Sequence, residues 1–315
     1  MKNTKHLMYV PFTGLGKFNG FRGNRWLRNR ITVFKEYTIP SLQAQINKNF
    51  IVWVSWRPEE KRNQLVIELE KWMKTTGLQF IFTYHGVCFY DDKYPQPEAY
   101  NRLVTALHGS IGELYEVISE ADEVLMTIQP SDDCYASWAT EFIQKGLSGD
   151  KLAGGFQKGY ISNYSTKEVS EYNPKTNPPF YTIKFTRDQF TDPLKHVRYT
   201  AMKTAEDQYP AGTPLPSHEY PPNVFGDKYV RWDISGFLVG CHGENISTYY
   251  DHPYKGNQLH DDELYEIQAE FGIDESPHLR FKLGWKRWIL KKLPHKVRRK
   301  VRYWFTEKLY DFLRS

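Results

Sequence analysis

The amino-terminal half of the chain alternates short apolar runs with segments of helical periodicity. Apolar runs of strand length lie at residues 6–12, 50–56, 79–84 and 123–128. Between them, apolar side chains recur at three- and four-residue spacing, which predicts helices at 26–45, 59–75 and 100–118. Strands and helices that alternate in this way predict crossover connections on a Rossmann-like, mainly parallel sheet flanked by helices.

The pattern changes near residue 152, where short runs are broken by Asn, Pro and Gly, as in residues 174–179 and 210–222. This pattern predicts short antiparallel strands joined by long loops. We therefore expect an irregular α+β second half that completes one α/β domain over residues 1–279. Helical periodicity returns over residues 280–315, where Pro294 separates two predicted helices.

The charge of the chain is divided between these two parts. The net charge is +5, but residues 280–315 carry 13 Lys and Arg against two acids, a net +11. The first 279 residues carry 29 basic and 35 acidic side chains, a net −6. The basic character therefore belongs to the tail and not to the domain.

The tail has three interpretations. Its continuous apolar faces, with Trp285, Trp288 and Trp304 among many cations, fit an amphipathic helix that lies on an anionic membrane surface. A basic aromatic segment also suits nucleic acid, and a helix packed back on the domain is the structural alternative. The continuous apolar faces favour the membrane surface, so nucleic acid is the less favoured partner.

Composition indicates a soluble globular protein, because 40% of the residues are hydrophobic and 25% are charged. No apolar run approaches the roughly 20 residues that span a bilayer. The three cysteines are scattered, which fits reduced thiols better than a disulfide framework. We therefore predict a cytoplasmic protein, attached peripherally at the inner face of the membrane if the tail binds lipid.

The most informative residues are Asp132 and Asp133, because they follow the buried strand predicted at 123–128. An amphipathic segment, residues 135–145, begins directly after them. Two interpretations are open at this point. The pair either caps the next helix or holds a divalent cation, since hard cations take oxygen ligands.

Other candidate groups fall at the same edge of the sheet. His242 ends a second predicted strand, and it would add a third ligand to the aspartate pair. The glycine-rich stretch at 14–20 has the wrong spacing for a dinucleotide or P-loop motif. Arginines follow it, and their planar guanidinium groups suit phosphates: Arg22, Arg25, Arg28 and Arg30. No zinc-protease, zinc-ribbon or serine-hydrolase motif is present.

Three motifs in order resemble the putative rhamnosyltransferase family, a branch of the GT-A glycosyltransferases. Arg30, Phe34 and residues 39–54 are similar to its opening "R…F…PSL-x-x-Q…dF-x-W-x-V". Residues 131–133 match its "LD-S/N-DD" position, and residues 242–247 resemble its "HG-x-N-x-S". The resemblance covers roughly residues 6–250.

The resemblance implies a GT-A-like fold and the transfer of a sugar, rhamnose by the family's label, from a nucleotide-diphosphate donor to a glycan or lipid-linked acceptor. Mg²⁺ or Mn²⁺ would clamp the diphosphate, held by Asp132, Asp133 and His242. Asp132 would also contact the sugar.

Further roles are expected for charged and aromatic side chains. Arg22 and Arg102 are the candidate diphosphate partners, and Arg30 is a further candidate for binding the substrate. An inverting reaction needs a carboxylate base. We favour Asp233, beside Trp232 as a sugar platform, while Asp188, Glu219 and Asp227 stay open.

Two positions depart from the family pattern. Ile128, Gln129 and Pro130 stand where the family usually has Arg-Leu-Asp, so the first acid of the DxD-type motif is missing. The strand that usually ends in Asp near the nucleotide base ends here in Ser55, followed by Trp56. The alternative function is therefore a catalytically degenerate protein of this fold that binds a nucleotide or carbohydrate.

Overall fold

The computed structural model describes residues 3–13, 23–86, 96–175, 178–192, 221–242, 245 and 249–273. The predicted tail at 280–315, the domain boundary at 279, the glycine-rich stretch and Arg22 lie outside these ranges. Arg102 lies in a described helix, but its side chain is outside the description.

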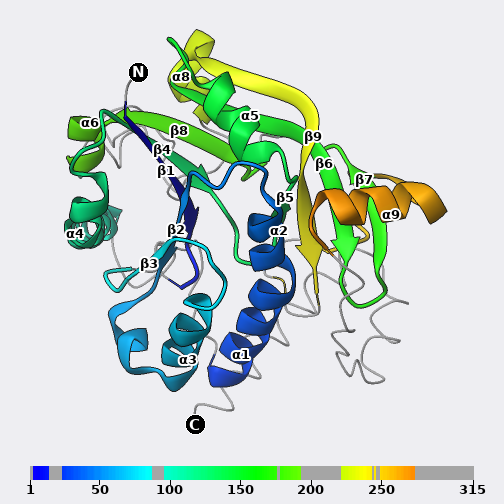
Figure 1. Cartoon of the computed structure of the whole chain (residues 1–315), viewed down its shortest axis with the longest axis horizontal. Helices are drawn as coiled ribbons and strands as arrows, with labels where there is room; N and C mark the ends of the chain where they lie inside the picture. Colours follow the sequence, from blue (N-terminus) through cyan, green and yellow to red (C-terminus); the bar gives the residue numbers. More distant parts are fainter. Residues whose placement is uncertain are drawn as a thin grey trace.

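The described chain forms one mixed sheet with helices on both faces (Figure 1). The strands are β1 (Thr4–Val10), β2 (Ile51–Ser55), β3 (Phe80–Thr83), β4 (Glu123–Ile128), β5 (Cys134–Tyr135), β6 (Ala153–Asn163), β7 (Glu168–Tyr172), β8 (Tyr181–Thr186), β9 (Tyr229–Cys241) and β10 (Lys255–Gln258). The α-helices are α1 (Asn24–Val33), α2 (Ile39–Ala44), α3 (Gln64–Met73), α4 (Gln96–Ile118), α5 (Ala139–Gly146), α6 (Arg187–Thr191), α8 (Pro221–Phe225) and α9 (Asp261–Glu270). None of the helices in the described ranges is both long enough and apolar enough to cross a membrane.

The first half of the sheet is parallel, in the order β3-β2-β1-β4. Beyond β4 the order continues β8-β6-β7-β10 with antiparallel pairing, and β9 joins β6 in parallel and β5 in antiparallel fashion. The predicted α/β fold with a Rossmann-like first half and an α+β second half is therefore confirmed. This arrangement is consistent with the GT-A-like organisation that the resemblance implies.

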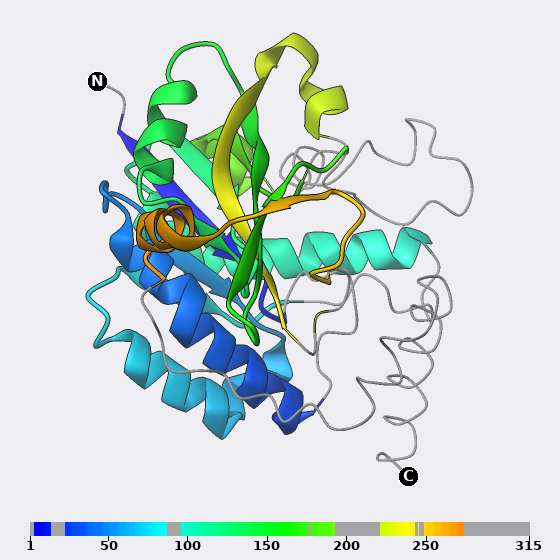
Figure 2. The ribbon, with the colours of Figure 1, turned by 90° about the vertical axis from the view of Figure 1, so that its right-hand side faces the viewer.

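Alternation along β1 explains why helices cover both faces. Met8 and Val10 point into a core shared with α1, α2 and α3, whereas Leu7 and Tyr9 point into a core shared with α4. Figure 2 shows α4 on one side of the sheet and α1 with α3 on the other. A parallel strand buried on both faces is largely apolar, which is why residues 7–10 of β1 and 51–54 of β2 are continuous apolar runs.

The helix predicted over 26–45 is interrupted. A π-helical turn, η1 (Phe34–Thr38), separates α1 from α2. The predicted helix at 59–75 likewise begins as a 3₁₀ turn, η2 (Pro58–Arg62), before α3. The apolar pattern does not distinguish these turns, because it reports which face is buried and not the hydrogen-bond spacing.

A buried polar chain ties β1 to β4, β8 and α5. The amide nitrogen of Gln144 donates to Nδ1 of His6 (3.1 Å), so the His6 proton lies on Nε2. Nε2 donates to the Thr127 hydroxyl (2.7 Å), which bonds the Thr182 hydroxyl (2.6 Å). The His6 ring is neutral in this series of hydrogen bonds, and burial lowers the pKa of His6 from 6.5 to about 3.

We expect His6 to make stability fall in mild acid. Between pH 6.5 and about 3 the unfolded chain binds a proton at His6 that the folded protein does not, so stability is lost as the pH falls through this window. The loss is about 1.4 kcal/mol per pH unit. Urea unfolding at pH 7.5 and pH 5 measures it, and the pH dependence should be smaller by about 2 kcal/mol in His6→Gln. An unchanged pH dependence in His6→Gln would contradict this assignment.

Candidate functional site

The predicted acid pair lies in a turn between β4 and β5, at the carboxyl end of the parallel strands. The Gln129 amide closes this turn by donating to the carbonyl oxygens of Pro130 and Asp133, both at 2.9 Å. β5 then pairs with β9, with Cys134 opposite Leu238. The turn is therefore held against the end of β9, which brings residues over 100 positions apart in the sequence into contact.

Arg30 of α1 meets the turn directly. Its Nε donates to the Ser131 hydroxyl (3.0 Å), and its Nη1 donates to Oδ2 of Asp132 (2.6 Å). The two side chains are nearly buried, with 12% of Arg30 and 9% of Asp132 exposed. Burial is the largest single influence and favours the neutral form of Asp132, but the charge of Arg30, together with the hydrogen bond from Arg30 and the contact with His242, lowers the pKa of this carboxyl overall.

His242 follows β9 and completes this group. Its side chain is fully buried, and its Nε2 lies 3.0 Å from Nη1 of Arg30 and 3.4 Å from Oδ2 of Asp132. A guanidinium can only donate, so Nε2 accepts from Arg30 and the imidazole is neutral, with its proton on Nδ1. The 3.4 Å contact with Asp132 is therefore not an ion pair in this arrangement.

Asn245 belongs to the same group, although the sequence analysis did not select it. Its amide nitrogen donates to Oδ2 of Asp132 (3.2 Å) and to the carbonyl of Gly240 (2.6 Å), and its oxygen accepts from the His242 amide. The signal that pointed to it was the "HG-x-N" motif, in which it is the fourth residue. We name Arg30, Ser131, Asp132, His242 and Asn245 the Arg30 cluster.

Asp133 has its hydrogen-bond partner outside the Arg30 cluster. Its Oδ1 accepts from the Gly240 amide (2.8 Å). Burial and the nearby charge of Asp132 raise the pKa of Asp133 well above its usual range. This carboxyl therefore fastens the turn to β9 through the Gly240 amide.

Tyr164 and Gly240 contact the backbone of the turn at Asp132, and neither was predicted from the sequence as a site residue. The Tyr164 hydroxyl donates to the carbonyl of Asp132 (2.8 Å), and its ring stacks on Tyr37 with 3.5 Å between centroids. A side chain at Gly240 would overlap both that carbonyl and the Tyr164 ring. No sequence signal marks these residues, because the contact exists only where β6, β9 and η1 meet.

The capping interpretation of the acid pair is wrong. The N-cap of α5 is Trp138, and no side chain caps it. Asp132 and Asp133 instead accept from Arg30 and Gly240.

The predicted metal ligands do not form a metal site in this arrangement. Among the described residues, no three His, Cys, Asp or Glu side chains are placed to hold one ion. Oδ2 of Asp132 and Nε2 of His242 both accept from Arg30, and Asp133 is bonded to Gly240. The residues therefore do not fit a divalent cation while Arg30 stays in place, and the Mg²⁺ or Mn²⁺ ion remains a prediction.

The structure does not bring the predicted base and sugar platform to the Arg30 cluster, and this corrects their expected placement. Asp233 lies nine residues before His242, roughly 30 Å of strand path, and it pairs with Lys158 on an exposed surface. Trp232 is buried against Phe142 and Phe156. No local pattern distinguishes these placements, because residues beside an apolar run look alike in sequence whether they line a site or a core.

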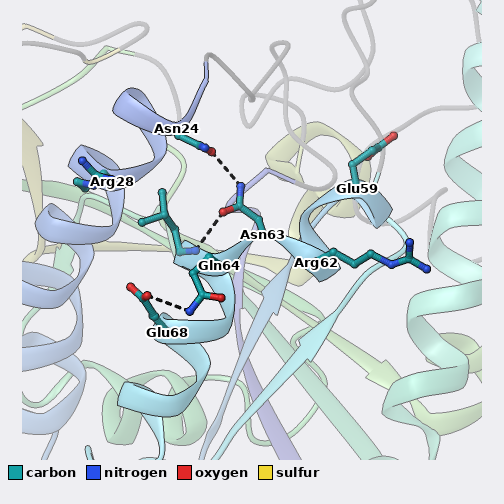
Figure 3. Close-up of a pocket in the computed structure, with 8 residues that line it drawn as sticks. Asn24, Arg28, Glu59, Arg62, Asn63, Gln64 and Glu68 are labelled. Carbon is teal, nitrogen blue, oxygen red and sulfur yellow. Dashed lines mark hydrogen bonds between the residues drawn. The ribbon is translucent and has the colours of Figure 1, made fainter.

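A cavity of about 600 Å³ lies elsewhere, between the amino-terminal ends of α1 and α3 (Figure 3). Its lining is polar: Asn24, Arg28, Glu59, Arg62, Asn63, Gln64 and Glu68, with Leu65. Asn63 accepts from the Leu65 amide and donates to Asn24 (3.1 Å). Arg28 and Arg30 are two residues apart, about 200° around a helix, so the cavity and the Arg30 cluster lie on opposite sides of α1.

Comparison with known proteins gives little similarity. No family model matches the chain, and no curated protein matches it. A solved structure of a "putative nucleotide-diphospho-sugar transferase" from Desulfovibrio desulfuricans G20 aligns over 76% of this chain and 82% of its own, with 11% identity and a TM-score of 0.35. A TM-score this low does not establish a shared fold.

We expect Gly240→Ala to destabilise the protein by about 1–3 kcal/mol, because an added methyl group overlaps the Asp132 carbonyl and the Tyr164 ring. Gly112→Ala is the matched control, since a side chain there meets nothing within 4 Å and Gly112 lies inside α4. The control should be neutral or slightly stabilising. Thermal unfolding of both variants checks the difference, and equal melting temperatures would contradict the tight packing at Gly240.

Proposed function

We infer that this protein is a glycosyltransferase that moves a sugar from a nucleotide-diphosphate donor to an acceptor hydroxyl. The observation that carries the proposal is the convergence of Arg30, Asp132 and His242, each from a different one of the three motifs, at the carboxyl end of β4. In open α/β sheets, ligands bind in the crevice outside the carboxyl ends of the strands. The Arg30 cluster lies at that position.

The chemistry of the Arg30 cluster fits a departing diphosphate. Negative charge develops on the leaving group during sugar transfer, and a fixed positive group nearby stabilises it. Arg30 is held by Ser131 and Asp132, so its orientation is set before a donor arrives. Asp132 and Asn245 add polar atoms that can bond sugar hydroxyls.

The finer parts of the proposal depend on the sequence resemblance. Rhamnose as the sugar, a glycan or lipid-linked acceptor, and Arg22 and Arg102 as further diphosphate partners belong to it. So does contact of residues 280–315 with a membrane surface. No step of the proposal depends on the predicted metal ion.

A second candidate function is supported by Pro130, which stands where the family has the first acid of its DxD-type motif. Gln129 here serves to close the turn. A protein that binds a nucleotide or carbohydrate and transfers nothing would keep this fold and the Arg30 cluster. The two functions differ in turnover and not in binding.

Asp132→Asn tests the proposal. The amide keeps an acceptor for Arg30 but removes the charge that fixes it, and misplacement of a reacting group by about 1 Å costs roughly 100-fold in rate. We expect release of nucleoside diphosphate from UDP-, dTDP- or GDP-sugars to fall by about that factor. Asp262→Asn, at an exposed position on α9, is the control and should match the wild type.

The outcomes separate the candidates. Release above background in the wild type, lost in Asp132→Asn and kept in Asp262→Asn, supports the transferase. Donor binding by calorimetry without release favours the binding protein. Wild type and Asp132→Asn that release at the same background rate and bind no nucleotide would reject both.

We also expect Asp233→Asn to keep this turnover within about twofold, since exposed surface substitutions usually have small effects. The residue lies far along β9 from the Arg30 cluster. A general base typically contributes about 100-fold or more to the rate. A loss of turnover of that size in Asp233→Asn would restore Asp233 as the catalytic base.

A further inference from the structure

One nitrogen of Arg30 occupies the position that a metal ion would need. Nη1 lies 2.6 Å from Oδ2 of Asp132 and 3.0 Å from Nε2 of His242, and these two acceptors are 3.4 Å apart. If an ion were bonded to both acceptors at about 2.1 Å, the angle between the two ligands at the ion would be near 110°, which is an ordinary angle for metal ligands. The acceptor pair is thus spaced as two ligands of one cation.

The guanidinium of Arg30 donates its hydrogen bonds to the same lone pairs that a metal ion would need. Arginine donates and never accepts, so Arg30 occupies the Nε2 lone pair of His242 and a lone pair of Asp132. The His242 proton is placed on Nδ1 by the same argument, which leaves Nε2 without a proton to lose on metal binding. The acceptors need no rearrangement to bind a metal; only Arg30 has to leave.

The positive charge of Arg30 also disfavours a divalent cation at Asp132 and His242. Arg30 carries a permanent positive charge, and the side chains of Arg30, Asp132 and His242 are 12%, 9% and 0% exposed, so water screens little of the repulsion between Arg30 and an entering ion. Asp133 does not offset this, because its Oδ1 already accepts a hydrogen bond from the amide of Gly240.

We propose that Arg30 is the resident cation of this cluster and excludes divalent metal ions from Asp132 and His242. Occupation by guanidinium and by metal is mutually exclusive. The Asp132–His242 pair is a latent metal site that opens only when the guanidinium is removed. The proposal concerns the resting protein and does not depend on the proposed function.

Mn²⁺ binding without any nucleotide tests it, measured by the loss of the free-ion signal in electron paramagnetic resonance. Arg30→Gln removes the charge with little change in side-chain length, and Arg30→Met is a second neutral variant. We expect either variant to bind Mn²⁺ at least about tenfold more tightly than the wild type, equivalent to about 1.4 kcal/mol. Arg30→Lys keeps the charge and should resemble the wild type.

The site of binding is established by the double variants. Adding Asp132→Asn or His242→Ala to Arg30→Gln should abolish the gain. Mn²⁺ should also raise the melting temperature of Arg30→Gln, in which Asp132 has lost its positively charged partner, and leave that of the wild type unchanged.

Three results would overturn the proposal. They are equal Mn²⁺ affinity in wild type and Arg30→Gln, a gain in Arg30→Gln that survives the loss of Asp132, and tight wild-type binding that Asp132→Asn abolishes. The last measurement needs no Arg30 variant, so it decides the question even if those variants fold poorly. Failure to bind nucleotide would reject the proposed function and leave these measurements unaffected.

Discussion

The ion pair between Arg30 and Asp132 is the interaction on which the site depends. Its two members come from α1 and from the β4–β5 turn, and both are largely removed from water. A buried charge without a partner costs several kcal/mol, so each member fixes the other in place. His242, Ser131 and Asn245 then satisfy the remaining hydrogen bonds, and the group behaves as one unit.

Two local irregularities of the backbone bring these residues together. The π turn after α1 inserts an extra residue per turn, so α2 presents a different face from the one that a continuous helix would present. Arg30 of α1 can then meet Asp132 while Ser41 of α2 bonds the backbone of Tyr135 (3.1 Å). The second irregularity is the turn closed by Gln129, which directs Asp132 and Asp133 to opposite partners.

Adjacent aspartates therefore have different chemistry. Asp132 is held as an anion by a fixed cation, whereas burial and that anion favour the neutral form of Asp133. Two neighbouring carboxylates in a sequence suggest a shared ligand, but a low-dielectric site disfavours two charges side by side unless a cation neutralises them. Here Arg30 supplies one positive charge, which is enough for one carboxylate.

The sequence by itself determined the alternation of strands and helices and the buried strand at residues 123–128, because apolar periodicity is a local signal. It also placed Asp132 and His242 after predicted strands, whereas Arg30 was associated with them only through the resemblance of three motifs. It did not determine the roles of Asn245, Tyr164 and Gly240, or the burial of Trp232. Only the tertiary structure decided that a guanidinium stands between Asp132 and His242. The physical reason is that hydrogen-bond partners and burial are set by residues distant in the chain, and a sequence pattern carries no record of which of them meet.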